Sequence, residues 1–212
     1  MKTVQVWDLP VRFFHWSLVF FFCFSYFTGE EETVWHSYSG YAIIALVTFR
    51  VIWGFIGSKY ARFADFIYSP KATHEYTLSL MKGAPKHYFG HNPLAALMVF
   101  ALIGSLALTT FSGLKAYALE GKGPLANLEV QIISNAVADD DDDEDERHPR
   151  HNYEFEEEED EFWEEVHEFF ANFTLMLVFV HIIGVIISSV VHKESVVSSM
   201  INGRKEPPTK ED

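Results

Sequence analysis

Cysteine is almost absent from this 212-residue chain, and its absence excludes several kinds of site. The single cysteine, Cys23, cannot form an intramolecular disulfide framework or a cysteine-based zinc site. No C-x-x-C-H motif is present, so covalent haem attachment is excluded as well. The sequence also lacks a nucleotide-binding loop and a Ser/His/Asp hydrolase signature. Cysteine-based frameworks and metal sites, covalent haem attachment and these two enzyme motifs are therefore excluded.

Basic residues are scarce and unevenly placed. The chain has 16 Lys and Arg against 30 Asp and Glu, a net charge of -14 at pH 7. No nucleic-acid partner is expected, because phosphate contacts need a basic surface. Residues 114–166 hold 4 basic and 19 acidic residues, whereas the rest of the chain holds 12 and 11. The protein is therefore a nearly neutral, apolar body that carries one acidic insert.

Four apolar runs are long enough to cross a bilayer, which takes about 20 residues. They cover residues 10–28, 36–56, 93–113 and 168–191. The first run has no small-residue cleavage site and three more follow it, so we expect it to be retained. The prediction is an all-α integral membrane four-helix bundle over residues 1–200. This domain includes an acidic loop at residues 114–166, and a disordered tail at residues 201–212 follows it.

The distribution of basic residues predicts the orientation. The segment between the second and third runs contains Lys59, Arg62, Lys71, Lys82 and Lys86, opposed only by Asp65 and Glu75. By the positive-inside rule this segment and both termini are cytoplasmic, and the acidic loop is periplasmic. A short helix around residues 72–82 is expected at the membrane surface. The chain is predicted to be a multi-pass protein of the bacterial inner membrane, in contact with membrane lipid.

Four histidines lie at membrane depth. His167 and His181 are fourteen residues apart, so they share one face of a helix, about 21 Å apart along its axis. His15 lies near the start of the first run at cytoplasmic depth, and His36 begins the second at periplasmic depth. The pairs that can meet are His15 with His181 and His36 with His167. Two facing imidazoles leave room for a planar macrocycle, and haem iron accepts such axial nitrogens.

Residues near these histidines fit the same interpretation. Gly40 lies one turn after His36, where a missing side chain permits a porphyrin to approach. Arg50 shares the face of His36 at the depth of the cytoplasmic pair, so a haem propionate could neutralise it. Arg12, one turn before His15, is a second candidate. The alternatives stay open: histidines at span edges can be interfacial anchors, Arg50 can snorkel, and glycines can serve close helix packing.

Three sequence segments resemble a known family. The first reads W-D-x-P-x-R-x-x-H-W from Trp7 to Trp16, and the second H-S-Y-S-G-Y then R-V-I-W-G-F-I-G from His36 to Gly57. The third reads H-E-F-F-A-N from His167, then V-H-I-I-G-V-I-I-S-S-V-V-H-K-E-S and M-I-N-G-R-K. Together with G-H-N-P at residues 90–93, these resemble the bacterial cytochrome b561 and nickel-hydrogenase cytochrome b subunit family. The resemblance covers essentially the whole chain except the acidic insert.

The resemblance implies a four-helix membrane bundle with two non-covalent b-type haems. By motif, the ligands fall on His15, His36, His167 and His181. It also implies electron transfer between the membrane quinone pool and a redox partner. Within the family, the chain looks most similar to members found beside small cytochromes c, and the hydrogenase subunit is a weaker match.

The acidic insert departs from the family pattern. Residues 139–146 are eight consecutive acids, and residues 154–165 add nine more among Phe155, Phe162 and Trp163. Such a run is typically a solvated, self-repelling loop. A dense negative patch could also dock a cationic periplasmic cytochrome c and raise its association rate. Two other functions are kept open: a quinone-linked oxidoreductase acting on a small oxidant such as superoxide, and a haem-free metal-handling transporter or scaffold.

Overall fold

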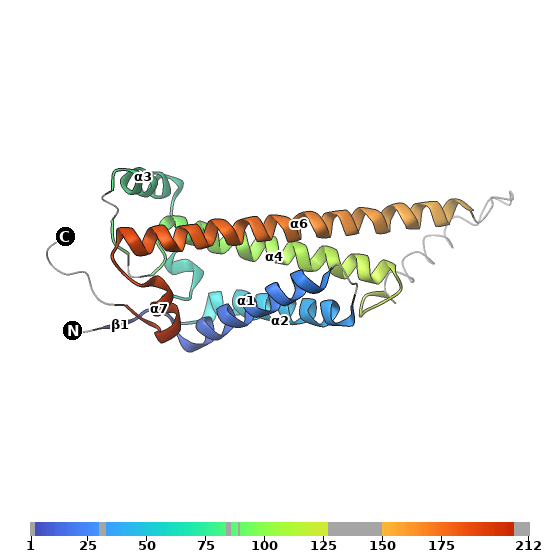
Figure 1. Cartoon of the computed structure of the whole chain (residues 1–212), viewed down its shortest axis with the longest axis horizontal. Helices are drawn as coiled ribbons and strands as arrows, with labels where there is room; N and C mark the ends of the chain where they lie inside the picture. Colours follow the sequence, from blue (N-terminus) through green and yellow to red (C-terminus); the bar gives the residue numbers. More distant parts are fainter. Residues whose placement is uncertain (1–2, 30–32, 84–85, 89, 127–149, 206–212) are drawn as a thin grey trace. The chain divides into compact units, whose positions relative to one another are not determined.

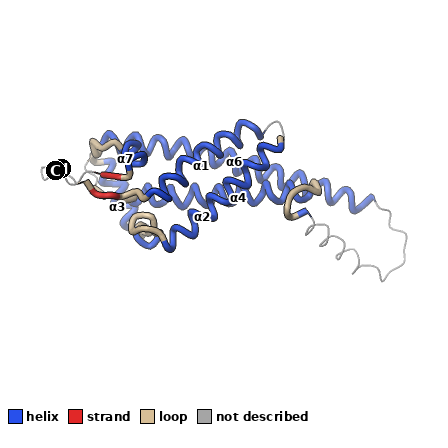
Figure 2. The backbone as a smooth tube through the Cα atoms, turned by 90° about the horizontal axis from the view of Figure 1, so that it is seen from below, coloured by secondary structure: helices blue, strands red, loops and turns tan. Residues whose placement is uncertain are grey.

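The computed structural model describes residues 3–29, 33–83, 86–88, 90–126 and 150–205 (Figure 1). Four helices are long and apolar enough to cross a membrane: α1 (Leu9–Thr28), α2 (Val34–Ile56), α4 (Pro93–Leu119) and the Glu161–Val191 part of α6 (Arg150–Val191). Many of their large apolar side chains are exposed, as Phe13, Phe20 and Phe27 are on α1. The predicted four spans are confirmed, and the described chain is mostly helical (Figure 2).

Polar side chains and a glycine mark the ends of these helices. The Asp8 carboxylate caps α1 by accepting from the Val11 amide at 2.9 Å, with Pro10 in the first turn. Asn92 caps α4 in the same way, accepting from the Ala95 amide at 2.8 Å. Gly57 follows the last residue of α2. Each cap satisfies an amide that has no partner within the helix.

The chain forms two compact units, and each is described by itself. The first comprises residues 1–104 and 175–212. In it α1 and α2 lie side by side and contact each other extensively (Figure 1). The short helix expected around residues 72–82 is present as α3 (Pro70–Met81), after the turn η2 (Phe63–Asp65).

The two ends of the chain meet within this first unit. Strand β1 (Val4–Gln5) pairs antiparallel with β2 (Arg204–Lys205), which follows α7 (Val196–Asn202) (Figure 2). The amides of Val6 and Trp7 also donate to the Gly203 carbonyl. The disorder predicted from residue 201 is therefore wrong for residues 201–205. The polar composition of the tail gave no sign of its partner, which lies about 200 residues earlier.

The second unit comprises residues 105–174. Here α4 continues past Gly113, the expected end of the third span, as far as Leu119. Helix α6 begins at Arg150, so much of the predicted acidic loop 114–166 is helical. Within it, Glu161, Glu164 and Glu165 are exposed. The acidic run at 139–146 lies outside the described residues, and its docking role stays a prediction.

Candidate functional site

His15 on α1 and His181 on α6 face each other inside the first unit. Their ring centroids are 6.4 Å apart, and their planes are inclined by 55°. The Nδ1 atom of His15 is buried and makes no hydrogen bond with the part of the chain that the structure describes. We call these two residues the inner pair. The structure thus brings together the first of the two predicted histidine pairs.

The geometry of the inner pair suits a metal ion between the rings. A metal–imidazole bond is about 2 Å long, so two trans imidazoles place their ring centroids about 6 Å apart. The separation of 6.4 Å is close to that value. It is too long for a direct hydrogen bond between ring nitrogens, which would bring the centroids to about 5 Å. Two facing imidazoles of this kind would be able to hold a haem iron.

Arg50 on α2 is a buried cation, with only 3% of its surface exposed. Its guanidinium carbon lies 4.8 Å from the centroid of the Phe63 ring. The Nη1 atom is buried and has no hydrogen-bond partner among the described residues. Gly54, one turn later, makes room for Phe63, because an added Cβ would lie 2.1 Å from that ring. A buried cation without a close carboxylate is costly, so this position favours an anionic ligand.

Asp8 is the acidic group whose charge acts on Arg50. Besides capping α1, its carboxylate accepts from Trp53 Nε1 at 3.0 Å and from Ser58 Oγ at 2.6 Å. Burial alone would raise the pKa of Asp8, but the hydrogen bonds from Ser58, Val11 and Trp53 outweigh it and hold the pKa below its ordinary value. Asp8 therefore stays ionised, while its hydrogen bonds go to groups other than Arg50.

His91 lies close to Arg50 and was not predicted as a site residue. Its ring packs edge-on against Trp7, with centroids 4.7 Å apart, and it is tilted by 44° against the Phe66 ring, with centroids 4.4 Å apart. Its Nδ1 atom is buried without a described partner. Burial lowers the pKa of His91 to about 3, and the positive charges of Arg50 and Lys205 act in the same direction. His91 is therefore a neutral imidazole, electrostatically coupled to Arg50 and His181.

His36 on α2 is oriented by the end of α1. Its Nδ1 atom lies 3.0 Å from the Ser25 carbonyl and 3.3 Å from Ser25 Oγ. Since a carbonyl only accepts, the proton is assigned to Nδ1 and the lone pair to Nε2. A backbone carbonyl on one ring nitrogen is the usual support of a histidine that binds metal through the other.

His167 on α6 has the same kind of support within the second unit. Its Nδ1 atom donates to the Thr109 carbonyl on α4 at 2.8 Å. The ring passes directly over Gly113, where an added Cβ would lie 2.7 Å from the imidazole. Gly113 was expected only as a helix end, and its actual role is to let His167 approach α4. Thr109 also joins Thr174 and Ser105 in a buried hydroxyl cluster.

Two other predicted site residues have different surroundings. Arg12 donates through Nη2 to the Ile201 carbonyl, so it tethers α7 to α1, which the propionate hypothesis did not anticipate. At Gly40 an added Cβ would meet nothing within 4 Å. Close helix packing therefore does not explain Gly40, and open space beside this helix is what a macrocycle would need.

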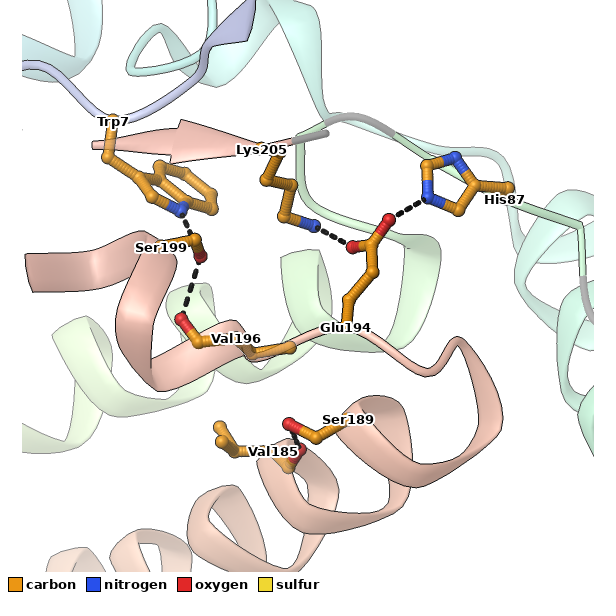
Figure 3. A network of polar contacts seen from close by, with 8 residues as sticks. All are labelled: Trp7, His87, Val185, Ser189, Glu194, Val196, Ser199 and Lys205. Carbon is orange, nitrogen blue, oxygen red and sulfur yellow. Dashed lines mark hydrogen bonds and ion pairs between the residues drawn. The ribbon is translucent and has the colours of Figure 1, made fainter. Parts of the chain in front are cut away.

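A cluster of titratable groups joins the last residues of the chain to the loop before α4 (Figure 3). Glu194 accepts from His87 Nε2 at 2.7 Å and pairs with Lys205 Nζ at 3.5 Å. His192 packs edge-on against His87, with ring centroids 5.5 Å apart. Nearby, Trp7 Nε1 donates to Ser199 Oγ at 3.3 Å. Sequence motifs did not reveal these contacts, because their members are up to 192 residues apart.

Four helices of membrane-spanning length, two of which hold facing imidazoles, define a multi-pass membrane protein with histidines inside its apolar region. Residues 6–203 match the family model of prokaryotic cytochrome b561, and the chain belongs to this family. It is thus a multi-pass protein of the bacterial inner membrane. The predicted family is confirmed.

Two curated relatives are similar to part of the chain. The chain is 28% identical over 150 residues to the probable Ni/Fe-hydrogenase B-type cytochrome subunit of Azotobacter chroococcum mcd 1. It is 27% identical to the corresponding subunit of Azotobacter vinelandii. The matches cover 57% of this chain and 62% of each relative, so the chain spans about three fifths of the length of the curated relatives it matches. No solved structure matches the chain.

Proposed function

We propose that this protein binds two b-type haems, each between two histidines, and transfers electrons between the quinone pool and a periplasmic redox partner. His15 and His181 ligate one haem. By the depth match in the sequence, His36 and His167 ligate the other, and we call them the outer pair. When bound, haem iron carries one electron by cycling between its ferric and ferrous states. The positive-inside rule puts the inner pair near the cytoplasm.

The observation that carries the proposal is the inner pair. Its two rings come from helices far apart in the sequence and stand 6.4 Å apart, with the buried His15 Nδ1 unbonded among the described residues. An interhelical hydrogen bond would bring the nitrogens within about 3 Å instead. The rest of the chain's contribution is to hold these rings in a low-dielectric, water-poor environment.

Other residues are proposed to hold the cofactor rather than the iron. Arg50 would neutralise a propionate near the inner pair, because its Nη1 is buried without a described partner. Gly40 would leave room for the macrocycle near the outer pair. Arg12 is a weaker candidate than Arg50 for binding a propionate, since its hydrogen bond to the Ile201 carbonyl already gives it a structural role.

The identity of the redox partner has two candidates. The acidic insert supports a small cationic cytochrome c, because opposite charge speeds association. The names of the relatives support a Ni/Fe-hydrogenase as electron donor instead. Adding each purified partner to the reduced or oxidised cytochrome and following the haem absorbance discriminates between them.

The test of the proposed function is a reduced-minus-oxidised spectrum of the purified full-length protein with haem quantitation. We expect about two low-spin b-type haems per chain. His15→Ala or His181→Ala should remove one haem, and His36→Ala or His167→Ala the other. His74→Ala is the matched control, because His74 is an exposed histidine on α3. Protein without haem, or a ligand variant with both haems intact, contradicts the proposal.

A further inference from the structure

We propose that Thr174 on α6 is a positioning residue for the outer site. Through its contacts with hydroxyl groups of α4, it sets the distance at which His167 meets the Thr109 carbonyl. We call Ser105, Thr109, Ser112 and Thr174 the hydroxyl cluster. The inference rests on the proposed function, which makes His167 a haem ligand, and it assigns a role to a residue outside the proposed ligand set.

The hydroxyl cluster is buried in the second unit, where α4 and α6 meet. Its four residues are between 1% and 9% exposed. The three members on α4, at positions 105, 109 and 112, recur every three or four residues and therefore share one face of that helix. A hydroxyl group in an apolar environment is costly unless it is hydrogen-bonded, so the contacts within the cluster restrict how the two helices can pack.

The hydroxyl protons at this contact can be assigned. Thr174 Oγ1 donates to the Phe170 carbonyl of its own helix at 2.8 Å, so it accepts from Ser105 Oγ at 2.5 Å. Thr109 Oγ1 donates to the Ser105 carbonyl at 2.9 Å and lies 3.3 Å from Thr174 Oγ1. Two hydroxyl groups of α4 thus converge on the oxygen of Thr174. The 2.5 Å separation requires an oxygen at this position, because a carbon atom could not approach so closely.

The same face of α6 carries His167. It lies seven residues before Thr174, which is about two helical turns. His167 Nδ1 donates to the Thr109 carbonyl at 2.8 Å. Thr109 therefore contacts α6 twice, through its hydroxyl at Thr174 and through its carbonyl at His167. Both contacts depend on the spacing of the same two helices, so a change at Thr174 is transmitted to His167.

Valine at position 174 would test this dependence, because it keeps the shape of threonine and replaces the hydroxyl with a methyl group. Ordinary contacts of a carbon atom begin at 3.4 Å, whereas Ser105 Oγ lies at 2.5 Å. The helices would have to separate here by about 0.9 Å, the difference between those two distances. Any part of this displacement that reaches His167 lengthens its hydrogen bond to Thr109. An imidazole that loses such support is a less basic ligand and binds metal more weakly.

A simpler role for the hydroxyl cluster is to hold α4 and α6 together, as hydroxyl groups do between many membrane helices. The sequence position of Thr174 separates the two roles, because it lies seven residues after His167 and seven before His181. A general loosening of α6 would disturb both ligands. Loss of positioning through Thr109 would disturb His167 alone, and the inner haem therefore serves as an internal comparison.

The experiment compares the full-length protein carrying both haems with Thr174→Val and Thr174→Ser. Haem affinity, midpoint potentials and the electron paramagnetic resonance signals of the ferric haems are measured for each. We expect Thr174→Val to weaken haem binding at the outer pair by about tenfold. It should also raise the potential of the outer haem, because a less basic ligand favours the oxidised iron less. Thr174→Ser keeps the oxygen and should behave like the unmodified protein. His15→Ala, which should lack the inner haem, identifies the outer signal.

Thr110→Val is the matched control. Thr110 lies on α4, and its hydroxyl donates to the Leu106 and Ala107 carbonyls of the same helix at 2.8 and 3.2 Å. Ser105→Ala removes the donor to Thr174 without adding bulk, so it should change the outer signal in the same direction. It decides the question if Thr174→Val does not fold.

Three results would overturn this inference and leave the proposed function standing. The first is an outer haem whose affinity, potential and resonance signal are unchanged in Thr174→Val, or in Ser105→Ala where the valine variant does not fold. The second is an equal change at both haems, and the third is a Thr174→Ser variant that behaves like Thr174→Val. Fewer than two haems in the unmodified protein overturn the proposed function itself, and this inference with it.

Discussion

The close approach of His167 to α4 makes Gly113→Ala the sharpest single test of the outer site. An alanine Cβ at this position would lie 2.7 Å from the imidazole, whereas ordinary contacts begin at 3.4 Å. The ring must therefore retreat by about 0.7 Å, the difference between those two distances. A retreat of that size away from α4 lengthens the 2.8 Å bond to the Thr109 carbonyl to about 3.5 Å, beyond a useful hydrogen bond.

The loss of this hydrogen bond in Gly113→Ala should affect both stability and haem binding. Loss of one such hydrogen bond costs about 0.5–1.5 kcal/mol of stability. Loss of a supporting group behind a metal-binding histidine typically costs about 10- to 100-fold in affinity for the metal. We therefore expect Gly113→Ala to weaken haem binding at the outer pair by about that factor. The inner pair should keep its haem.

The assay is a haem titration of the apoprotein, followed by absorbance, with Gly104→Ala as the control. Gly104 lies on the same helix, and an added Cβ there meets nothing within 4 Å. Both substitutions raise helix propensity by about 1 kcal/mol, so a weakened helix cannot explain a difference between them. If Gly113→Ala binds two haems with wild-type affinity and spectrum, the reasoning about His167 is refuted.

Three further predictions concern other positions. Gly40→Leu should remove the outer haem without lowering the melting temperature of the apoprotein, since its Cβ meets nothing within 4 Å. Gly203→Ala should cost about 1–2 kcal/mol in thermal unfolding, because φ is +82° and its Cβ would lie 2.6 Å from the Trp7 carbonyl oxygen. His91 has a lowered pKa, so the unfolded chain binds more protons between about pH 6.5 and 3, and stability falls as the pH is lowered across that window. His91→Gln should remove a slope of at most about 1.4 kcal/mol per pH unit, and an unchanged slope contradicts it.

The parts of the fold that depend on local sequence could be predicted. The four spans follow from the length of the apolar runs, and the starts of α1 and α4 follow from Asp8 and Asn92. The pairing of His15 with His181 could be predicted from their depths in the membrane, because a helix rises by a fixed distance per residue. His15 and His181 could therefore be matched before any contact between them was known.

The parts that depend on distant contacts could not be predicted. Gly113 resembles a helix end in the sequence, and only the position of His167 shows why it must be glycine. His91 is one of several loop histidines until Trp7 and Phe66 are seen to enclose it. The pairing of Val4 with Lys205 joins two segments without a strand-like pattern of their own. In each case a long-range contact determines the role of a residue whose local sequence is ordinary.

The Ser25 carbonyl, which supports His36, and the Thr109 carbonyl, which supports His167, lie at different positions in their helices. Ser25 lies within the last four residues of α1, where carbonyls have no amide partner inside the helix and the helix dipole is negative; its carbonyl also accepts from Thr28 Oγ1 at 3.3 Å. Thr109 lies in the interior of α4, and its carbonyl also accepts from Ser112 Oγ at 3.0 Å. The bond to His36 therefore depends on where α1 ends, whereas the bond to His167 depends on the space at Gly113. Extending α1 by one turn should consequently alter the potential of the outer site, although no ligand is changed.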